Sequence, residues 1–182
     1  VHQGEWLKIQ GTSLAGKTVG IIGVGSIGQA LARRYQVLGM NILGYDVHPI
    51  DSNFCQETGL QPVELKQLFA ESDCIILCCN LTPENYHLLN QETFALMKDG
   101  VWIINVARGG LISETALIVA LKEGKVGAVA LDVFESEPLA KDHPLTKFPQ
   151  VICGSHNSSN TREAVLRVNQ KAIDNLVRDL KQ

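Results

Sequence analysis

The sequence predicts an α/β fold built on a doubly wound parallel sheet. Short runs of Val, Ile and Leu recur along the 182 residues, and each is apolar at successive positions instead of alternating. Such runs are typical of strands that are buried on both faces of a sheet. Segments with the apolar spacing of amphipathic helices separate the runs. Alternating strands and helices favour a parallel sheet with helices on both sides, in a single domain.

Each apolar run predicts one strand, and the intervening segments predict the helices. The expected strands cover residues 18–23, 41–46, 73–79, 101–106, 126–133 and 151–153. The expected helices cover residues 26–38, 63–69, 91–97, 113–122 and 161–180. Gly39, Gly100 and Gly124 follow helical patterns, and glycine is the residue that most readily adopts the left-handed conformation at a helix end. Residues 138–149 contain three prolines and predict a long loop.

The composition excludes several classes of protein. Hydrophobic residues make up 45% of the chain and charged residues 19%, which is enough apolar content for one core. Sixteen Lys and Arg against nineteen Asp and Glu give a net charge of −3 without a basic cluster, so no nucleic-acid partner is expected. No apolar run is long enough to span a membrane, and no membrane partner is expected. The five cysteines lack metal-ligand spacing, so we expect no metal site and small buried thiols in a reducing cytoplasm.

A glycine-rich turn follows the first predicted strand. Gly23, Gly25 and Gly28 form the pattern G-x-G-x-x-G between a strand-like and a helix-like run, which is the context that this motif requires. Gly23 permits the tight turn, Gly25 lets a pyrophosphate approach the backbone, and Gly28 lets helix and strand pack closely. The amides of Ser26 and Ile27 would open the helix, where its dipole favours an anion. The motif therefore indicates a dinucleotide-binding Rossmann fold.

Asp46 ends the next predicted strand, at the position where dinucleotide-binding folds carry an acidic residue for the ribose. A carboxylate there can accept hydrogen bonds from the adenosine ribose diol, and it would repel a 2′-phosphate. Residues 47–50 contain no Arg or Lys that would bind such a phosphate. The sequence therefore predicts NAD as the cofactor in preference to NADP.

Three ionisable residues follow later strands at the sheet edge where open α/β folds bind ligands: Arg108, Glu137 and His156. A guanidinium can hold a carboxylate through two parallel hydrogen bonds, and an imidazole can exchange a proton with an alcohol or a carbonyl. A carboxylate beside the imidazole fixes its tautomer. Each residue taken singly is more often a surface or capping residue. Together, with NAD alongside, they predict hydride transfer between an alcohol and a ketone that carries an adjacent carboxylate.

Four motifs resemble the nucleotide-binding domain of the D-2-hydroxyacid dehydrogenase family, especially its D-3-phosphoglycerate dehydrogenase and hydroxypyruvate/glyoxylate reductase branches. The motifs are the glycine-rich segment 14–28, Asn-Val-Ala-Arg-Gly-Gly at 105–110, Ala-Leu-Asp-Val-Phe-Glu-Ser-Glu-Pro at 130–138 and Val-Ile-Cys-Gly-Ser-His at 151–156. The resemblance extends over nearly the whole chain. It implies that Arg108 binds the substrate carboxylate, that His156 is the acid/base, and that Glu137 pairs with it.

The resemblance also implies further cofactor contacts. It places Asp132 against the nicotinamide carboxamide and Ala107 against the nicotinamide ribose. Cys79, at the end of the expected strand 73–79, is expected to contact the cofactor where the family commonly has Thr-Pro. The chain also has Ser155 where the family usually has a proline, and Asn-Ser-Ser at 157–159 where a Gly or Ala is frequent. These departures predict a looser loop around His156.

The resemblance implies a domain organisation as well. Residues 1–13 are expected to be a connecting segment that includes Trp6, residues 14–160 the NAD-binding domain, and residues 161–182 a helix that leads to a substrate domain absent from this chain. The first residue is not Met and no signal peptide follows, so we expect a piece of a longer protein. Such a domain would bind NAD, would have little or no activity by itself, and in this family typically forms homodimers.

Three alternatives remain open at this point. Some relatives of the family act as dinucleotide-sensing transcriptional corepressors and carry the same three residues. Phosphonate dehydrogenases also share Arg, Glu and His. A Rossmann module without catalytic chemistry is a third possibility, but it gives no reason for the three residues at one sheet edge.

Overall fold

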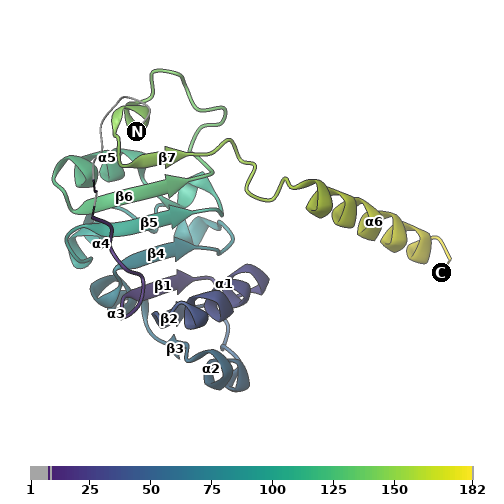
Figure 1. Ribbon diagram of the computed structural model, residues 1–182. Helices are drawn as coiled ribbons and strands as arrows, with labels where there is room; N and C mark the ends of the chain where they lie inside the picture. The colour runs from purple at the N-terminus through teal and green to yellow at the C-terminus, as the bar shows by residue number, and fades with distance from the viewer. Residues whose placement is uncertain (1–7, 9, 182) are drawn as a thin grey trace.

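Seven parallel strands form one sheet in the order β3-β2-β1-β4-β5-β6-β7 (Figure 1). The computed structural model describes residue 8 and residues 10–181. The expected segment 1–13, with Trp6, therefore lies largely outside the described residues. The strands are β1 Thr18–Ile22, β2 Asn41–Tyr45, β3 Gln61–Pro62, β4 Cys74–Leu77, β5 Val101–Asn105, β6 Val126–Leu131 and β7 Val151–Cys153.

Helices connect the strands and cover both faces of the sheet (Figure 1). They are α1 Ser26–Val37, α2 Ser52–Thr58, α3 Leu65–Glu71, α4 Gln91–Leu96, α5 Glu114–Lys122 and α6 Arg162–Asp179, with short 3₁₀ turns at Pro83–Asn85, Gly109–Leu111 and Pro144–Lys147. Strand β1 lies near the middle of the sheet. The chain adds β2 and β3 on one side of β1 and then returns to add β4 to β7 on the other side, so the strand order reverses between β1 and β4. The predicted doubly wound α/β fold is confirmed.

Two elements were not expected from the sequence, namely α2 and β3. Strand β3 has only two residues, so it carries no apolar run. Helix α2 is bounded by two local features of the chain. The side chain of Asp51 accepts a hydrogen bond from the amide of Phe54 at 2.8 Å, and Gly59 ends the helix with a φ of 70°. An Asp before and a Gly after a short segment are helix-capping residues, and they could have indicated this helix.

Strand β7 differs from the prediction of strands buried on both faces. It lies at the edge of the sheet, and Ile152 remains 71% exposed. The same edge position exposes Cys153, so the expectation of five buried thiols is wrong at this residue and only partly met at three others. Cys74 is buried, and Cys55, Cys78 and Cys79 are half-buried. Burial raises the pKa of the Cys74 thiol to about 12 and that of Cys78 to about 11, so both stay protonated at neutral pH.

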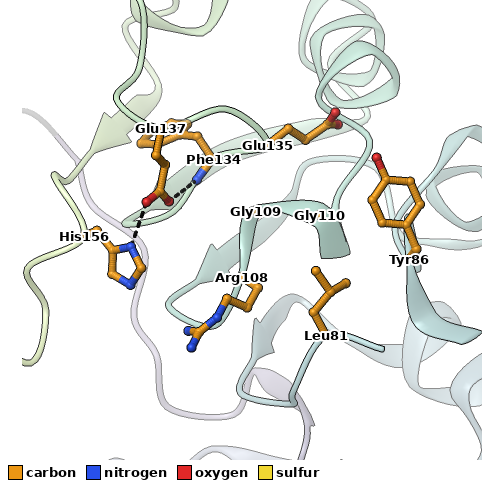
Figure 2. Close-up of a pocket in the computed structure, with 9 residues that line it drawn as sticks. All are labelled: Leu81, Tyr86, Arg108, Gly109, Gly110, Phe134, Glu135, Glu137 and His156. Carbon is orange, nitrogen blue, oxygen red and sulfur yellow. Dashed lines mark hydrogen bonds and ion pairs between the residues drawn. The ribbon is translucent and has the colours of Figure 1, made fainter. Parts of the chain in front are cut away.

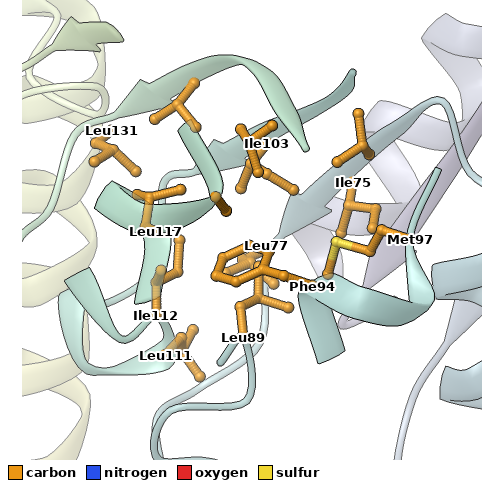
Figure 3. Packing of buried hydrophobic residues seen from close by; sticks show 14 of the residues in the cluster. Ile75, Leu77, Leu89, Phe94, Met97, Ile103, Leu111, Ile112, Leu117 and Leu131 are labelled. Atoms are coloured by element: carbon orange, nitrogen blue, oxygen red, sulfur yellow. The ribbon is translucent and has the colours of Figure 1, made fainter. Parts of the chain in front are cut away.

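The core consists of two apolar layers, one on each face of the sheet. Successive residues of β4 alternate between them: Ile75 and Leu77 pack with the layer under α3, α4 and α5, which Figure 3 shows, whereas Ile76 packs with the layer under α1 and α2. This alternation is the pleat of a strand. Burying a side chain such as Leu77 contributes roughly 1.5–3 kcal/mol to folding. The two layers fix the ends of the strands, where the site residues lie.

Helix α6 extends away from the sheet (Figure 1). It begins where the side chain of Thr161 accepts a hydrogen bond from the amide of Ala164 at 3.1 Å. Its apolar side chains, among them Ile173 and Leu176, are exposed, and none of its residues is buried. Among the described residues, no helix combines the length and the apolar character needed to cross a membrane.

Candidate active site

The glycine-rich turn lies after β1, where the strand order reverses. Gly23 has a φ of 94°, and a Cβ atom there would lie 2.5 Å from the amide nitrogen of Cys79. A Cβ atom on Gly28 would overlap the carbonyl oxygen of Gly23 and lie 3.2 Å from the side chain of Ile21. These two glycines are therefore required by the turn and by the packing of α1 on β1, as predicted.

Gly25 is different, because a Cβ atom on it would meet no protein atom within 4 Å. Its φ of −74° is accessible to any residue, so the fold itself does not require a glycine here. Gly25 is the N-cap of α1, and Ser26 and Ile27, the first helical residues, are exposed. Open space before exposed amides at the positive end of a helix fits the pyrophosphate of a dinucleotide.

The carboxylate of Asp46 lies beside this turn. Its Oδ2 accepts a hydrogen bond from the amide of Val24 at 2.7 Å, and its Oδ1 accepts one from the amide of His48 at 3.0 Å. Asp46 therefore links the end of β2 to the glycine-rich turn and remains partly exposed. The position agrees with that expected for a ribose-binding acid.

We expect Asp46→Ala to weaken NAD binding by about 1.5–3 kcal/mol, the loss of a hydrogen bond to a charged group. Discrimination against NADP should narrow as well, because the charge that repels a 2′-phosphate is removed. Calorimetric titration of both dinucleotides measures both effects. Asp46→Asn is the matched control, since it keeps an acceptor for the Val24 amide and removes only the charge. Unchanged discrimination in both variants would contradict the assignment.

Arg108, Glu137 and His156 come together at one pocket of about 360 Å³ (Figure 2). They follow β5, β6 and β7 at the carboxyl edge of the sheet. In Figure 2, the Arg108 guanidinium and the His156 ring lie on the same side of the pocket. The sequence did not identify the rest of the lining, which consists of Leu81, Tyr86, Gly109, Gly110, Phe134 and Glu135.

Glu137 and His156 form a hydrogen-bonded pair. Nδ1 of His156 lies 2.8 Å from Oε2 of Glu137, and the other carboxylate oxygen accepts a hydrogen bond from the Phe134 amide at 3.0 Å. The hydrogen bond to His156 and the Phe134 amide hold the pKa of Glu137 below its usual value, with a further contribution from the charge of Arg108. Glu137 therefore stays ionised at neutral pH. The His156 side chain is half exposed.

Asp132 holds the loop that carries His156. Its carbonyl oxygen accepts a hydrogen bond from the His156 amide at 2.8 Å, and its carboxylate oxygens accept from the amides of Asn157 at 3.0 Å and Ser158 at 2.8 Å. Burial opposes the charge of Asp132, but these hydrogen bonds outweigh it and lower its pKa. The loop is thus fixed at three successive amides. The loosening expected from Ser155 and residues 157–159 stays a prediction.

Asn105 is a site-supporting residue that the sequence did not single out. It is buried at the end of β5, and its side chain accepts a hydrogen bond from the Ala107 amide at 3.0 Å and donates one to the Arg108 carbonyl at 2.9 Å. Both bonds shape the turn that presents Arg108. A buried polar residue at the end of an apolar strand was the available indication. Nη1 of Arg108 donates to the Ala107 carbonyl at 2.7 Å.

The remaining predicted cofactor residues lie at the same sheet edge but outside this pocket. Cys79 is half-buried and adjoins Gly23, and burial raises the pKa of its thiol. Ala107 is buried. The carboxylate of Asp132 is engaged by the His156 loop. Their contacts with a nicotinamide remain predictions.

Residues 1–158 match the family model of the D-isomer specific 2-hydroxyacid dehydrogenase NAD-binding domain. The chain belongs to this family. It is an NAD-binding Rossmann domain, and its relatives are NAD-dependent oxidoreductases. The match extends from the glycine-rich turn to the loop of His156, so it includes every candidate site residue.

Several members of the D-2-hydroxyacid dehydrogenase family resemble the chain closely. D-3-phosphoglycerate dehydrogenase of Methanocaldococcus jannaschii is 44% identical over 180 residues, which are 97% of this chain and 33% of that protein. The apo structure of Escherichia coli D-lactate dehydrogenase has a TM-score of 0.85 at 41% identity, covering 96% of this chain and 54% of that one. D-lactate dehydrogenase of Aquifex aeolicus, complexed with NAD and lactic acid, has a TM-score of 0.87 at 31% identity, covering 98% and 57%.

The chain spans between a third and about three fifths of the length of the curated relatives that it matches. These relatives are named as dehydrogenases and reductases of 2-hydroxy and 2-keto acids. They do not favour the corepressor and phosphonate dehydrogenase alternatives.

Proposed function

We propose that this domain serves an enzyme that interconverts a D-2-hydroxy acid and its 2-keto acid with NAD(H). The observation that carries the proposal is the pocket in which Arg108 and the His156–Glu137 pair meet, at the sheet edge that also holds the glycine-rich turn. A cation for a carboxylate and a proton donor for the adjacent oxygen are the groups that a 2-keto acid requires.

Arg108, His156 and Glu137 have different roles in the proposed reduction. Arg108 holds the substrate carboxylate through its planar guanidinium and so places the neighbouring carbonyl beside His156. Bound NADH supplies the hydride. Glu137 accepts from Nδ1 of His156, which leaves Nε2 to give its proton to the carbonyl oxygen. In the reverse direction neutral His156 takes the proton of the hydroxyl group, and Glu137 stabilises the resulting imidazolium.

The direct test is the NADH-dependent reduction of 2-keto acids by the full-length protein that carries this domain. A panel of glyoxylate, hydroxypyruvate, pyruvate and 3-phosphohydroxypyruvate covers small and phosphorylated substrates. We expect reduction of at least one of them with NADH in preference to NADPH, measured by the loss of NADH absorbance. The formation of the D-isomer is checked by chiral chromatography. A protein that binds NADH and reduces no 2-keto acid would contradict the proposal.

The pair of Glu137 and His156 predicts a specific pH dependence. Reduction requires the protonated imidazole, so its rate should fall as the pH rises and that proton is lost. Glu137 remains a carboxylate over this range because its pKa is lowered, and it therefore stabilises the protonated form. Glu137→Gln keeps the shape and removes the charge, so the falling limb should move to lower pH. Coincident pH–rate profiles of the two proteins would show that Glu137 is not the partner of His156.

We further propose that residues 14–160 are the functional NAD-binding unit and that α6 leads into a substrate domain. The exposed apolar side chains of α6, and the extension of the helix away from the sheet, support this assignment. A homodimer and a cytoplasmic location are proposed on the family resemblance and on the free cysteines. Sedimentation velocity of the full-length protein tests the dimer.

A further inference from the structure

Two glutamates outside the catalytic pair, Glu114 and Glu135, are joined by hydrogen bonds from the backbone amide of each to the side-chain carboxylate of the other. The amide of Glu114, the first residue of α5, donates to Oε1 of Glu135 at 2.7 Å, and the amide of Glu135 donates to Oε1 of Glu114 at 2.8 Å. Glu135 lies in the turn that follows β6, two residues before Glu137. Two separate segments of the chain, 21 residues apart, are thus joined by a reciprocal pair of charge-assisted hydrogen bonds.

Each carboxylate also faces a histidine. Nε2 of His143 lies 3.1 Å from Oε2 of Glu114, and Nε2 of His87 lies 3.2 Å from Oε1 of Glu135. The His87 nitrogen is buried and has no hydrogen-bond partner of good geometry among the described residues, so Glu135 is the group that it faces. Because His143 lies in the loop after Glu137, the single carboxylate of Glu114 contacts the chain on both sides of Glu137.

The short turn of residues 134–137 connects the contacts of Glu114 to the pair of Glu137 and His156. The amide of Glu135 is bound by Glu114, and the preceding amide, that of Phe134, donates to Glu137 at 3.0 Å. A Cβ atom on Gly109 would overlap the carbonyl of Phe134, so the turn after Arg108 packs directly against the same backbone. The position of residues 134–137 therefore sets where Glu137 lies relative to both His156 and Arg108.

We propose that Glu114 is a positioning residue for the reaction: it fixes the turn at Glu135 and thereby keeps Glu137 at hydrogen-bond distance from His156. The proposal rests on the proposed function for its kinetic consequences. Glu114 itself is not among the residues that line the pocket, so its effect passes through Glu137.

The kinetic test is a double-mutant cycle in the full-length protein. Glu114→Ala should lower kcat roughly ten- to a hundredfold, the scale of a small misplacement of a catalytic group, with little change in the Kd for NADH. Glu114→Gln keeps an oxygen for the Glu135 amide and should restore most of the activity. In the Glu137→Gln background, Glu114→Ala should cause about twofold further loss or less, because the residue through which it acts has been changed. Full additivity of the two losses would overturn the proposal.

Two controls separate positioning from a general effect on folding. Glu123, an exposed residue at the other end of α5, provides the matched variant Glu123→Ala, which should keep the wild-type kcat. Where Glu114→Ala does not fold, Glu114→Asp shortens the same carboxylate by one carbon and should show the same non-additivity on a smaller scale. Equal activity of Glu114→Asp and the wild type would overturn the proposal.

A second measurement is independent of activity. In backbone NMR spectra of the present chain, Glu114→Ala should shift the amide signals of Phe134 and His156, as Glu137→Gln does. Changes confined to the residues next to Glu114 and Glu135, with the amide signal of His156 unmoved, would overturn the positioning role. If the wild-type protein reduces no 2-keto acid, the proposed function fails, and the NMR comparison still decides this inference.

Discussion

Replacing His156 with alanine is expected to lower kcat for 2-keto acid reduction by roughly 10²–10⁴-fold, the usual contribution of a positioned acid or base. The Kd for NAD should stay nearly unchanged, because the glycine-rich turn and Asp46 lie apart from this side chain. The fold should be retained, since the variant keeps the backbone amides of residues 156–158 that bind the loop to Asp132 and loses only the hydrogen bond to Glu137. Steady-state kinetics and calorimetry on the full-length protein measure the two quantities.

Asn160→Ala is the matched control for His156→Ala, because it changes another exposed residue of the same loop. It should leave kcat and the Kd for NAD unchanged. A loss of less than about fivefold in the His156 variant would be far below the contribution of an acid/base catalyst and would contradict the assignment.

Gly25→Val is expected to abolish NAD binding while the domain remains folded. The new side chain would point into the open space before α1, where no protein atom lies within 4 Å of the added Cβ atom. It would therefore occupy the space assigned to the pyrophosphate and would not strain the protein. Circular dichroism and thermal unfolding report the fold, and calorimetric titration of the present chain reports binding.

Gly11→Val is the control for Gly25→Val, since an added Cβ atom there also meets nothing within 4 Å and the residue is exposed outside the site. It should leave NAD affinity unchanged. A folded Gly25→Val variant that binds NAD with wild-type affinity would show that the phosphate does not approach this turn.

Much of the fold could be predicted because apolar runs, which indicate strands, and helical apolar spacing are both local features of the sequence. Strands such as β1 and β4 are buried along nearly their whole length, so their apolar runs are unbroken and easy to recognise. Strand β7 is as apolar in sequence but lies at an edge, and edge position is a property of the assembled sheet. Helix α2 was missed because its stability comes from capping and from the burial of Phe54, and its sequence SNFCQET has no repeated apolar spacing.

The candidate site was predicted in part for a similar reason. Arg108, Glu137 and His156 could be found because residues that follow parallel strands meet at one edge, whatever the connections between them. Their supporting residues could not be found in this way. Asp132 and Glu114 accept hydrogen bonds from backbone amides of distant segments, and such amides carry no signature in the sequence. Asn105 acts within its own turn, on the amide of Ala107. The interlocking of the turns after β5 and β6 is visible only in three dimensions.

The loop of His156 connects the sheet to helix α6. Only residues 157–161 lie between the catalytic imidazole and the start of α6, yet residues 156–158 are fastened to Asp132 at the end of β6. A swing of α6 relative to the sheet must therefore pivot about residues 159–161. With the substrate domain proposed above joined to α6, such a pivot would let that domain change its position while His156 stays in place on the NAD-binding domain.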